Sequence, residues 1–244
     1  MKGPIGLVTG SRPFAGLPTN PAELVLPHVD SLVVEGITIV AKPTPVSRNG
    51  LPTHLPELVA RYRPAFVLAL GLALGAPTIR IETIGVNAMH FGIPDNEGVR
   101  PQGGEPIDPA GPPARVATWN ADAVVAAILD DGIPAKASFH AGTHLCNLTL
   151  YTYLGALEAA GLAASPCGFL HLPYLPEQIV WMMRQQAGHP GSALAANLEL
   201  PSMALETQIR AVKAALGAMA RQAAAAPKIT TGNRTSQTPE DHPS

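Results

Sequence analysis

The segment Ala65-Phe-Val-Leu-Ala-Leu70 is apolar throughout and lacks the polar alternation of a half-exposed strand. Such a run predicts a strand whose two faces are both covered, as in a sheet that lies between layers of helices. The segment before it, Leu55–Tyr62, is predicted to be a short helix that Arg63-Pro64 ends. A helix followed directly by a doubly covered strand is typical of an α/β layer fold.

Outward from this strand, short apolar runs alternate with segments of helical period. Further strands are predicted at Ile5–Thr9, Gly36–Ala41, Ile79–Val86, Ala135–Phe139 and Gly168–Leu172, and helices at Ala121–Leu129, Leu145–Ala159 and Met203–Ala224. We see no repeat and no internal boundary, so residues 1–226 are expected to form one α/β domain. Residues 227–244 carry Thr, Pro and charge without an apolar period and are expected to be a disordered tail.

One connection stands out by its length. The segment from about Gly92 to Pro113 is dense in Gly and Pro. Loops of this length in compact domains are more often functional than idle.

The composition excludes several classes of protein. Of 244 residues, 46% are hydrophobic, enough to bury a core, and only 14% are charged, against roughly 25% in soluble domains. The net charge of −2 gives no field that would attract nucleic acid or an anionic membrane. Sparse charge also indicates that copies of the chain cover part of its surface. Two cysteines and no evident signal peptide or membrane span predict a soluble cytoplasmic protein with reduced thiols.

Cys146 is a candidate nucleophile. It lies in Phe139-His-Ala-Gly-Thr-His-Leu-Cys-Asn147, just past the point where a predicted strand leads into a predicted helix. The partial positive charge of a helix N-terminus favours the thiolate over the thiol. The alternative is a small apolar residue packed on the helix face, because free cysteines are often buried.

His171 and Glu82 are the candidate partners of that cysteine. His171 ends a short strand, where open α/β sheets build their sites, and could exchange a proton near neutral pH, or be a core histidine. Glu82 is the only acid inside an apolar strand and therefore needs a partner. That partner is either Arg80, two residues away on the same face, or an imidazole N–H whose tautomer Glu82 would fix.

Other constellations are weaker. His140, His144 and Cys146 have the residue types of a metal site but lack the Glu of H-E-x-x-H, so no metal is expected. The segment from Gly71 to Ala76 fails G-x-G-x-x-G, and the chain contains no P-loop. No cofactor is expected.

Four blocks together resemble the pyroglutamyl-peptidase I (pyrrolidone-carboxylate peptidase) family over about residues 4–222. The blocks are Thr9–Gly16 with Asn20-Pro21, Leu70–Asn87 with Ile93–Gly98, Ser138–Asn147, and Gly168–Gln178. The resemblance implies a phosphorylase/hydrolase-like, single-domain three-layer α/β/α sandwich with a mixed central sheet. It also implies a homodimer or homotetramer that needs no metal.

The same resemblance implies a cysteine exopeptidase that removes an N-terminal pyroglutamyl (5-oxoprolyl) residue from a blocked peptide through a thioester acyl-enzyme. Cys146, His171 and Glu82 would be its triad. The implied substrate-binding residues are Phe14, Asn20, Leu72, Ile93 and Phe139.

The substrate pocket departs from the family's pattern. Ser11 stands where the family has Phe, Leu72 where it has Gln, and Ala76 and Gly92 where it has Arg; Phe139 and His140 replace small polar residues. Two alternatives therefore remain open. One is a cysteine amidohydrolase of the same fold acting on another small cyclic or acyl amide, and the other is a ligand-binding homologue with vestigial chemistry.

Overall fold

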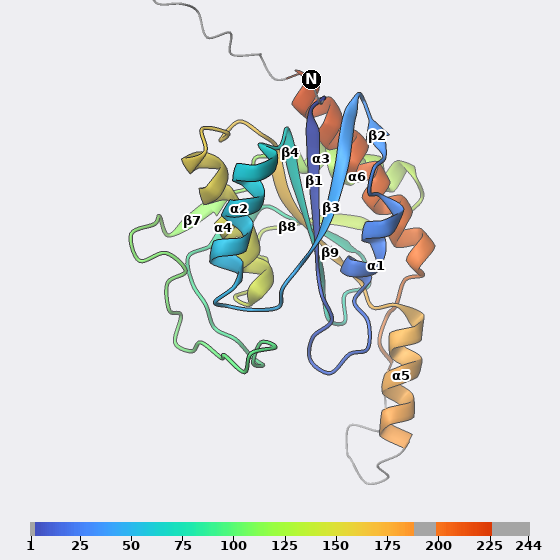
Figure 1. The fold of residues 1–244 in the computed structure, drawn as a ribbon. Helices are drawn as coiled ribbons and strands as arrows, with labels where there is room; N and C mark the ends of the chain where they lie inside the picture. Colours follow the sequence, from blue (N-terminus) through green and yellow to red (C-terminus); the bar gives the residue numbers. More distant parts are fainter. Residues whose placement is uncertain (1–2, 188–198, 226–244) are drawn as a thin grey trace, which may run out of the picture.

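The computed structural model describes residues 3–187 and 199–225. Its centre is a sheet of seven strands in the order β2-β3-β1-β4-β9-β5-β8 (Figure 1). The strands are β1 Ile5–Ser11, β2 Val33–Val34, β3 Ile37–Thr44, β4 Phe66–Leu72, β5 Ile79–Glu82, β8 Ala135–Ser138 and β9 Cys167–Leu172. Strands β3, β1, β4 and β9 are parallel, whereas β2 runs antiparallel to β3, and β5 antiparallel to β9 but parallel to β8. The sheet is therefore mixed.

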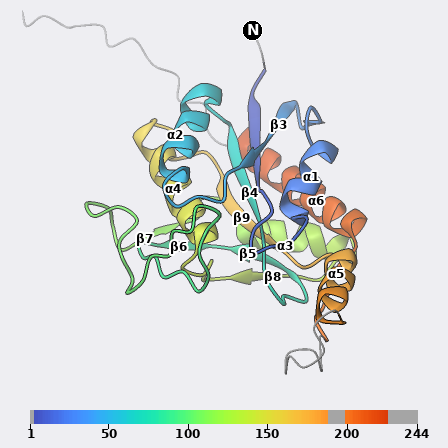
Figure 2. The same ribbon diagram turned by 60° about the horizontal axis from the view of Figure 1, so that its bottom comes forward.

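Helices cover both faces of this sheet. They are α1 Pro21–Val25, α2 Leu51–Tyr62, α3 Ala121–Asp130, α4 Leu145–Ala159, α5 Pro176–Ala187 and α6 Leu205–Ala225. Helices α2 and α4 lie on one face and α1, α3 and α6 on the other, while α5 extends beyond the sheet (Figures 1 and 2). The predicted three-layer α/β/α sandwich is confirmed.

Strand β4 shows why the sequence folds this way. Every residue from Phe66 to Leu72 is buried, and side chains alternate between the two faces. Leu68 and Leu70 pack into the cluster with α1, α3 and α6, while Val67 and Ala69 pack into the cluster with α2 and α4. Full burial of each large side chain contributes about 1.5–3 kcal/mol. The strand therefore holds two helical layers together.

The prediction of one strand over Ile79–Val86 is wrong. The chain leaves the main sheet at Thr83, whose N–H and hydroxyl both donate to the carbonyl of Ser138. The next residues, Ile84–Val86, form β6, which pairs with β7 Ala114–Val116 in a separate two-stranded sheet. The apolar run is continuous in sequence, but its two halves belong to different sheets.

Helices α1 and α5 were not predicted from the sequence, and helix α2 begins earlier than predicted. Helix α1 has five residues, too short for a helical period, and α5 begins at Pro176 inside the segment that follows β9. Helix α2 begins at Leu51 rather than Leu55 and contains Pro56. A proline inside a helix normally marks a boundary, and this misplaced the predicted start.

The long segment between β6 and β7 is tied to the rest of the fold. Its ends are joined by Asn87, whose amide donates to the Asp108 carbonyl and accepts the Asp108 N–H. In its middle, buried Asp95 accepts backbone N–H groups of Arg48, Glu97 and Val99. These bonds give the loop a fixed course.

Two expectations concern the limits of the chain. The tail predicted over residues 227–244 lies outside the described residues. Within residues 3–187 and 199–225, no helix has the length and apolar character needed to cross a membrane.

Candidate active site

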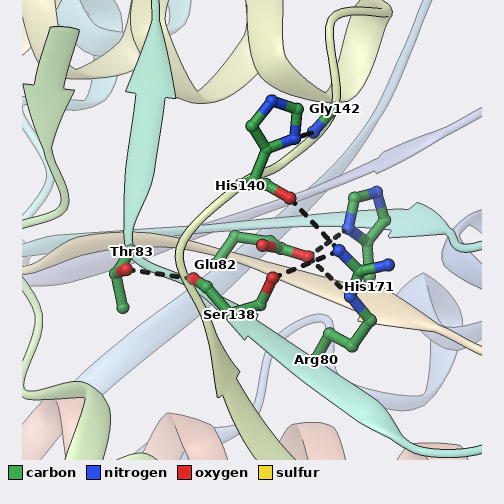
Figure 3. Close-up of polar contacts among 7 residues, drawn as sticks. All are labelled: Arg80, Glu82, Thr83, Ser138, His140, Gly142 and His171. Atoms are coloured by element: carbon green, nitrogen blue, oxygen red, sulfur yellow. Dashed lines mark hydrogen bonds and ion pairs between the residues drawn. The ribbon is translucent and has the colours of Figure 1, made fainter.

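His171 and Glu82 meet across two neighbouring strands. His171 lies near the carboxyl end of β9 and Glu82 at the end of antiparallel β5. The imidazole Nδ1 is 2.7 Å from Glu82 Oε1 (Figure 3), and both residues are buried, with exposed fractions of 6% and 0%. Because a carboxylate only accepts, Nδ1 carries the proton. The tautomer is therefore fixed, and Nε2 is left for a third group.

That third group is Cys146, the second residue of α4. Gly71 of β4 pairs with His171 of β9, and a Cβ built on Gly71 would lie 3.0 Å from Cys146 Sγ. The sulfur therefore lies over the backbone of Gly71, beside His171. Cys146 is also the neighbour that raises the pKa of His171 most strongly. The structure thus brings the three predicted triad residues together.

The charge state of His171 follows from its neighbours. Burial opposes the charged imidazole, but the charge and hydrogen bond of Cys146, followed by those of Glu82, outweigh it and raise the pKa of His171 to about 9. Near neutral pH the imidazole is a cation facing sulfur. An imidazolium beside a cysteine stabilises the nucleophilic thiolate.

We expect kcat/KM to fall on the alkaline side as the pH rises through about 9, because His171 then loses its proton and can no longer protonate a leaving amine. Since Cys146 helps to raise this pKa, the Cys146→Ala variant should titrate His171 at lower pH. A pH–rate profile and an NMR titration of His171 measure the two effects. An alkaline limb near pH 6.5, the ordinary histidine value, would contradict the assignment.

Glu82 has both of the partners that the sequence offered as alternatives. Besides His171, the Nε of Arg80 lies 3.2 Å from Glu82 Oε1. The two contacts share one oxygen because Arg80 stands opposite His171 in the β5–β9 register, while Arg80 and Glu82 lie on the same face of β5. The ion pair and the imidazole bond therefore coexist.

Gly71 makes room for the sulfur and for the ring of Phe169, which meets His171 edge-on with centroids 4.9 Å apart. We expect Gly71→Ala to lose about 10²-fold in kcat through displacement of the sulfur and to lose about 1–3 kcal/mol of stability through overpacking. The added Cβ would lie 2.6 Å from Phe169 Cζ. Turnover and thermal unfolding measure the two losses.

Gly6→Ala is the matched control for Gly71→Ala. Its Cβ would overlap the ring of Phe66, at the opposite end of β4, away from Cys146. It should be destabilised and yet keep the kcat of the wild type. Equal kcat losses in the two variants would contradict a specific role for Gly71.

Two aromatic rings lie around His144, the residue that precedes α4. The ring of His144 is 4.1 Å from Phe91 and 6.4 Å from half-buried Phe14, between centroids, and its Nε2 donates to the Ile93 carbonyl at 3.1 Å. Burial lowers the pKa of His144, which favours a neutral ring at physiological pH. The sequence pattern indicates His144 only as a possible metal ligand.

The metal interpretation gains no support from the side chains. His140 Nδ1 accepts the N–H of Gly142, and His144 Nε2 donates a hydrogen bond to the Ile93 carbonyl. Across the described part of the chain, no group of three or more His, Cys, Asp or Glu side chains is gathered as a metal would require.

The remaining predicted substrate-binding residues lie in different surroundings. Leu72 is buried in an apolar cluster with Leu17, Tyr174 and Ile179, which half-buried Phe14 also contacts. Ile93 and Phe139 are exposed, with exposed fractions of 36% and 71%.

Asn20 is buried within the chain's own hydrogen bonds. Its Oδ1 accepts the Ala22 N–H and caps α1, while its Nδ2 donates to the Arg12 carbonyl. It therefore shapes the loop that carries Phe14.

Asn147 is a site residue that sequence reasoning did not single out. It is fully buried on α4, accepts the Val86 N–H and donates to the carbonyls of Val86 and Ala88. These bonds hold β6 against the helix that carries Cys146. Asn147 could have been found from its place in the sequence, as an amide directly after the nucleophile on the buried face of an apolar helix. A buried side-chain amide requires hydrogen-bond partners.

A cysteine at a helix N-terminus, beside an imidazole and a carboxylate on neighbouring strands of an α/β/α sheet, defines the site of a cysteine hydrolase. The family model for pyroglutamyl peptidase matches residues 5–222. The chain belongs to the pyroglutamyl peptidase family, which confirms the resemblance found in its sequence blocks.

Relatives and solved structures agree with this membership. The chain is 35% identical to the pyrrolidone-carboxylate peptidase of Thermococcus onnurineus over 84% of this chain and 93% of that one. It is 36% identical to that of Escherichia fergusonii, over 86% and 90%. A structure of pyrrolidone carboxyl peptidase from Pyrococcus furiosus superposes with a TM-score of 0.81 at 32% identity, covering 89% of this chain and 99% of that chain.

Proposed function

We propose that this chain is a cysteine-type omega peptidase that hydrolyses the amide bond after an N-terminal pyroglutamyl residue. The observation that carries the proposal is the alignment of Glu82, His171 and Cys146 within a fold of this family. Cys146 is the nucleophile, His171 the acid and base, and Glu82 the group that holds the imidazole.

The geometry supports a thiol acyl transfer. The Cys146 thiolate attacks the carbonyl that joins the cyclic residue to the next one. Backbone N–H groups in the first turn of α4 lack intrahelical partners and can hold the developing oxyanion. His171 then protonates the leaving amine, and water, deprotonated by the same imidazole, cleaves the thioester.

The surroundings suit an uncharged acyl group. A pyroglutamyl ring has no amino-terminal charge, so its pocket should be apolar with few polar partners. We assign Phe14 to a wall of this pocket, supported by the loop that Asn20 shapes and by the cluster of Leu72. Ile93 borders it beside the His144 ring, and exposed Phe139 is assigned to its mouth.

The test is release of a fluorophore from a pyroglutamyl amide, compared with the prolyl and N-acetyl amides of the same fluorophore. Selective turnover of the pyroglutamyl amide is expected. Preference for an acyl amide without the lactam would favour the amidohydrolase alternative. A Cys146 that does not react with iodoacetamide, together with ligand binding and no turnover, would favour the vestigial homologue.

We also propose a cytoplasmic homo-oligomer, dimer or tetramer, built from the peptidase domain of residues 1–226. The sparse surface charge supports assembly, as do Val180 and Met183 of α5, which are 46% and 49% exposed. Sedimentation equilibrium should give two or four chains, and a monomer at micromolar concentration would contradict assembly.

A further inference from the structure

The two oxygens of Glu82 are bonded unequally. Oε1 accepts the His171 Nδ1–H at 2.7 Å and forms an ion pair with Arg80, whose Nε lies 3.2 Å away. Oε2 is buried and has no hydrogen-bond partner among the described residues. The position of the whole carboxylate therefore depends on one hydrogen bond and one ion pair that converge on the same oxygen.

The other end of the Arg80 side chain reaches the segment that leads to the nucleophile. Its Nη2 donates to Ser138 Oγ and to the His140 carbonyl, each at 3.1 Å (Figure 3). Ser138 is the last residue of β8, and His140 lies six residues before Cys146. One guanidinium thus joins the carboxylate to the connection between β8 and α4.

The strand order makes this bridge possible. Strand β5 lies between β9 and β8, so Arg80 faces His171 on one side, and Glu82 pairs with Ser138 on the other. The planar guanidinium of arginine carries several N–H groups in a fixed arrangement, so that it can contact a carboxylate, a hydroxyl and a carbonyl at the same time. A lysine ammonium lacks this planar arrangement of donors. The Arg80 side chain is 33% exposed, but the carboxylate that it holds is fully buried.

We propose that Arg80 is a positioning residue of this site. It fixes the Glu82 carboxylate and, through Ser138 and His140, the course of the segment that carries Cys146, so that the imidazole and the sulfur stay aligned. This inference rests on the proposed peptidase function for its kinetic readout. Arg80 touches no reacting atom and acts through Glu82.

Arg80→Met should lower kcat on the pyroglutamyl amide by on the order of tenfold to a hundredfold while KM changes little, because misalignment affects the reacting groups and not acyl binding. Arg80→Lys, which keeps the charge without the fork, should recover part of kcat. In a Glu82→Gln background, Arg80→Met should cost less than about threefold, because residues that act through one another are not additive. Wild-type kcat in Arg80→Met, or an equal loss in both backgrounds, would overturn the proposal.

Arg210→Met is the matched control. Arg210 of α6 also bonds a carboxylate and a carbonyl, both of Asp131, on the opposite face of the sheet. It should keep the kcat of the wild type, and a loss equal to that of Arg80→Met would count against a specific role for Arg80.

A second readout does not depend on the substrate. The rate at which iodoacetamide alkylates Cys146 near neutral pH, followed by mass spectrometry, should fall in Arg80→Met and recover in part in Arg80→Lys. If the wild type leaves the pyroglutamyl amide intact while alkylation depends on Arg80, the proposed function fails and this inference stands. If alkylation is the same in wild type and Arg80→Met, the inference is overturned whatever the substrate.

Discussion

A Cys146→Ala variant should lose at least about 10⁴-fold in turnover of a pyroglutamyl amide, because no other group can form the thioester. Cys146 Sγ is the sulfur that lies over Gly71 beside His171, and it is half-buried at the start of α4. Removal of one half-buried sulfur should leave the fold intact. Fluorophore release under single-turnover conditions measures the loss.

Cys167→Ala is the control for this variant. Cys167 lies in β9, is fully buried in the core, and burial raises the pKa of its thiol, so it stays neutral and inert. Its replacement should cost roughly 1 kcal/mol of stability and leave kcat unchanged. Equal turnover by Cys146→Ala and the wild type would reject Cys146 as the nucleophile.

The second large effect is expected at Glu82. Glu82→Gln should lower kcat by about 10³-fold, less than the 10⁴-fold that a wrong imidazole tautomer costs in a serine protease. Burial lowers the pKa of His171, while Cys146 and Glu82 raise it, so loss of the carboxylate charge must lower it from about 9. The alkaline limb of the pH–rate profile should therefore move to lower pH.

Glu158→Gln serves as the matched control for Glu82→Gln. Glu158 of α4 is also paired with an arginine, Arg115, but at the surface and away from His171. It should keep both kcat and the alkaline limb of the wild type. If Glu82→Gln shows the same behaviour as this control, Glu82 has no part in holding the imidazole.

Much of the fold could be predicted from the sequence because its central strand is unambiguous. The apolar run at Ala65–Leu70 has no polar alternation, and the structure covers β4 on both faces. The prediction of a single strand over Ile79–Val86 failed because this apolar run contributes strands to two different sheets. The break between them at Thr83 depends on hydrogen bonds to Ser138, which is distant in sequence. Short α1 offered too few residues for any period.

The triad residues could be proposed from sequence because each is chemically unusual in its place. Glu82 is an acid in an apolar strand, His171 ends a strand, and Cys146 begins a helix. The simultaneous contacts of Glu82, a hydrogen bond with His171 and an ion pair with Arg80, could not be foreseen, because they follow from the antiparallel register of β5 and β9. The residue pattern along one strand does not reveal which strand pairs with it, or whether the two strands are parallel or antiparallel.

The reversal of β5 within the sheet has a consequence for how the enzyme can move. His171, Glu82 and Gly71, over whose backbone the sulfur lies, all belong to neighbouring strands that are hydrogen-bonded to one another. These groups cannot separate without breaking the sheet, so the acid–base machinery is assembled before any substrate arrives. Differences in what the site accepts are therefore left to the loops around it, including the segment whose Ile93 carbonyl bonds His144. Substitutions in these loops can therefore change which ligand the site accepts, while the reacting groups on the sheet keep their positions.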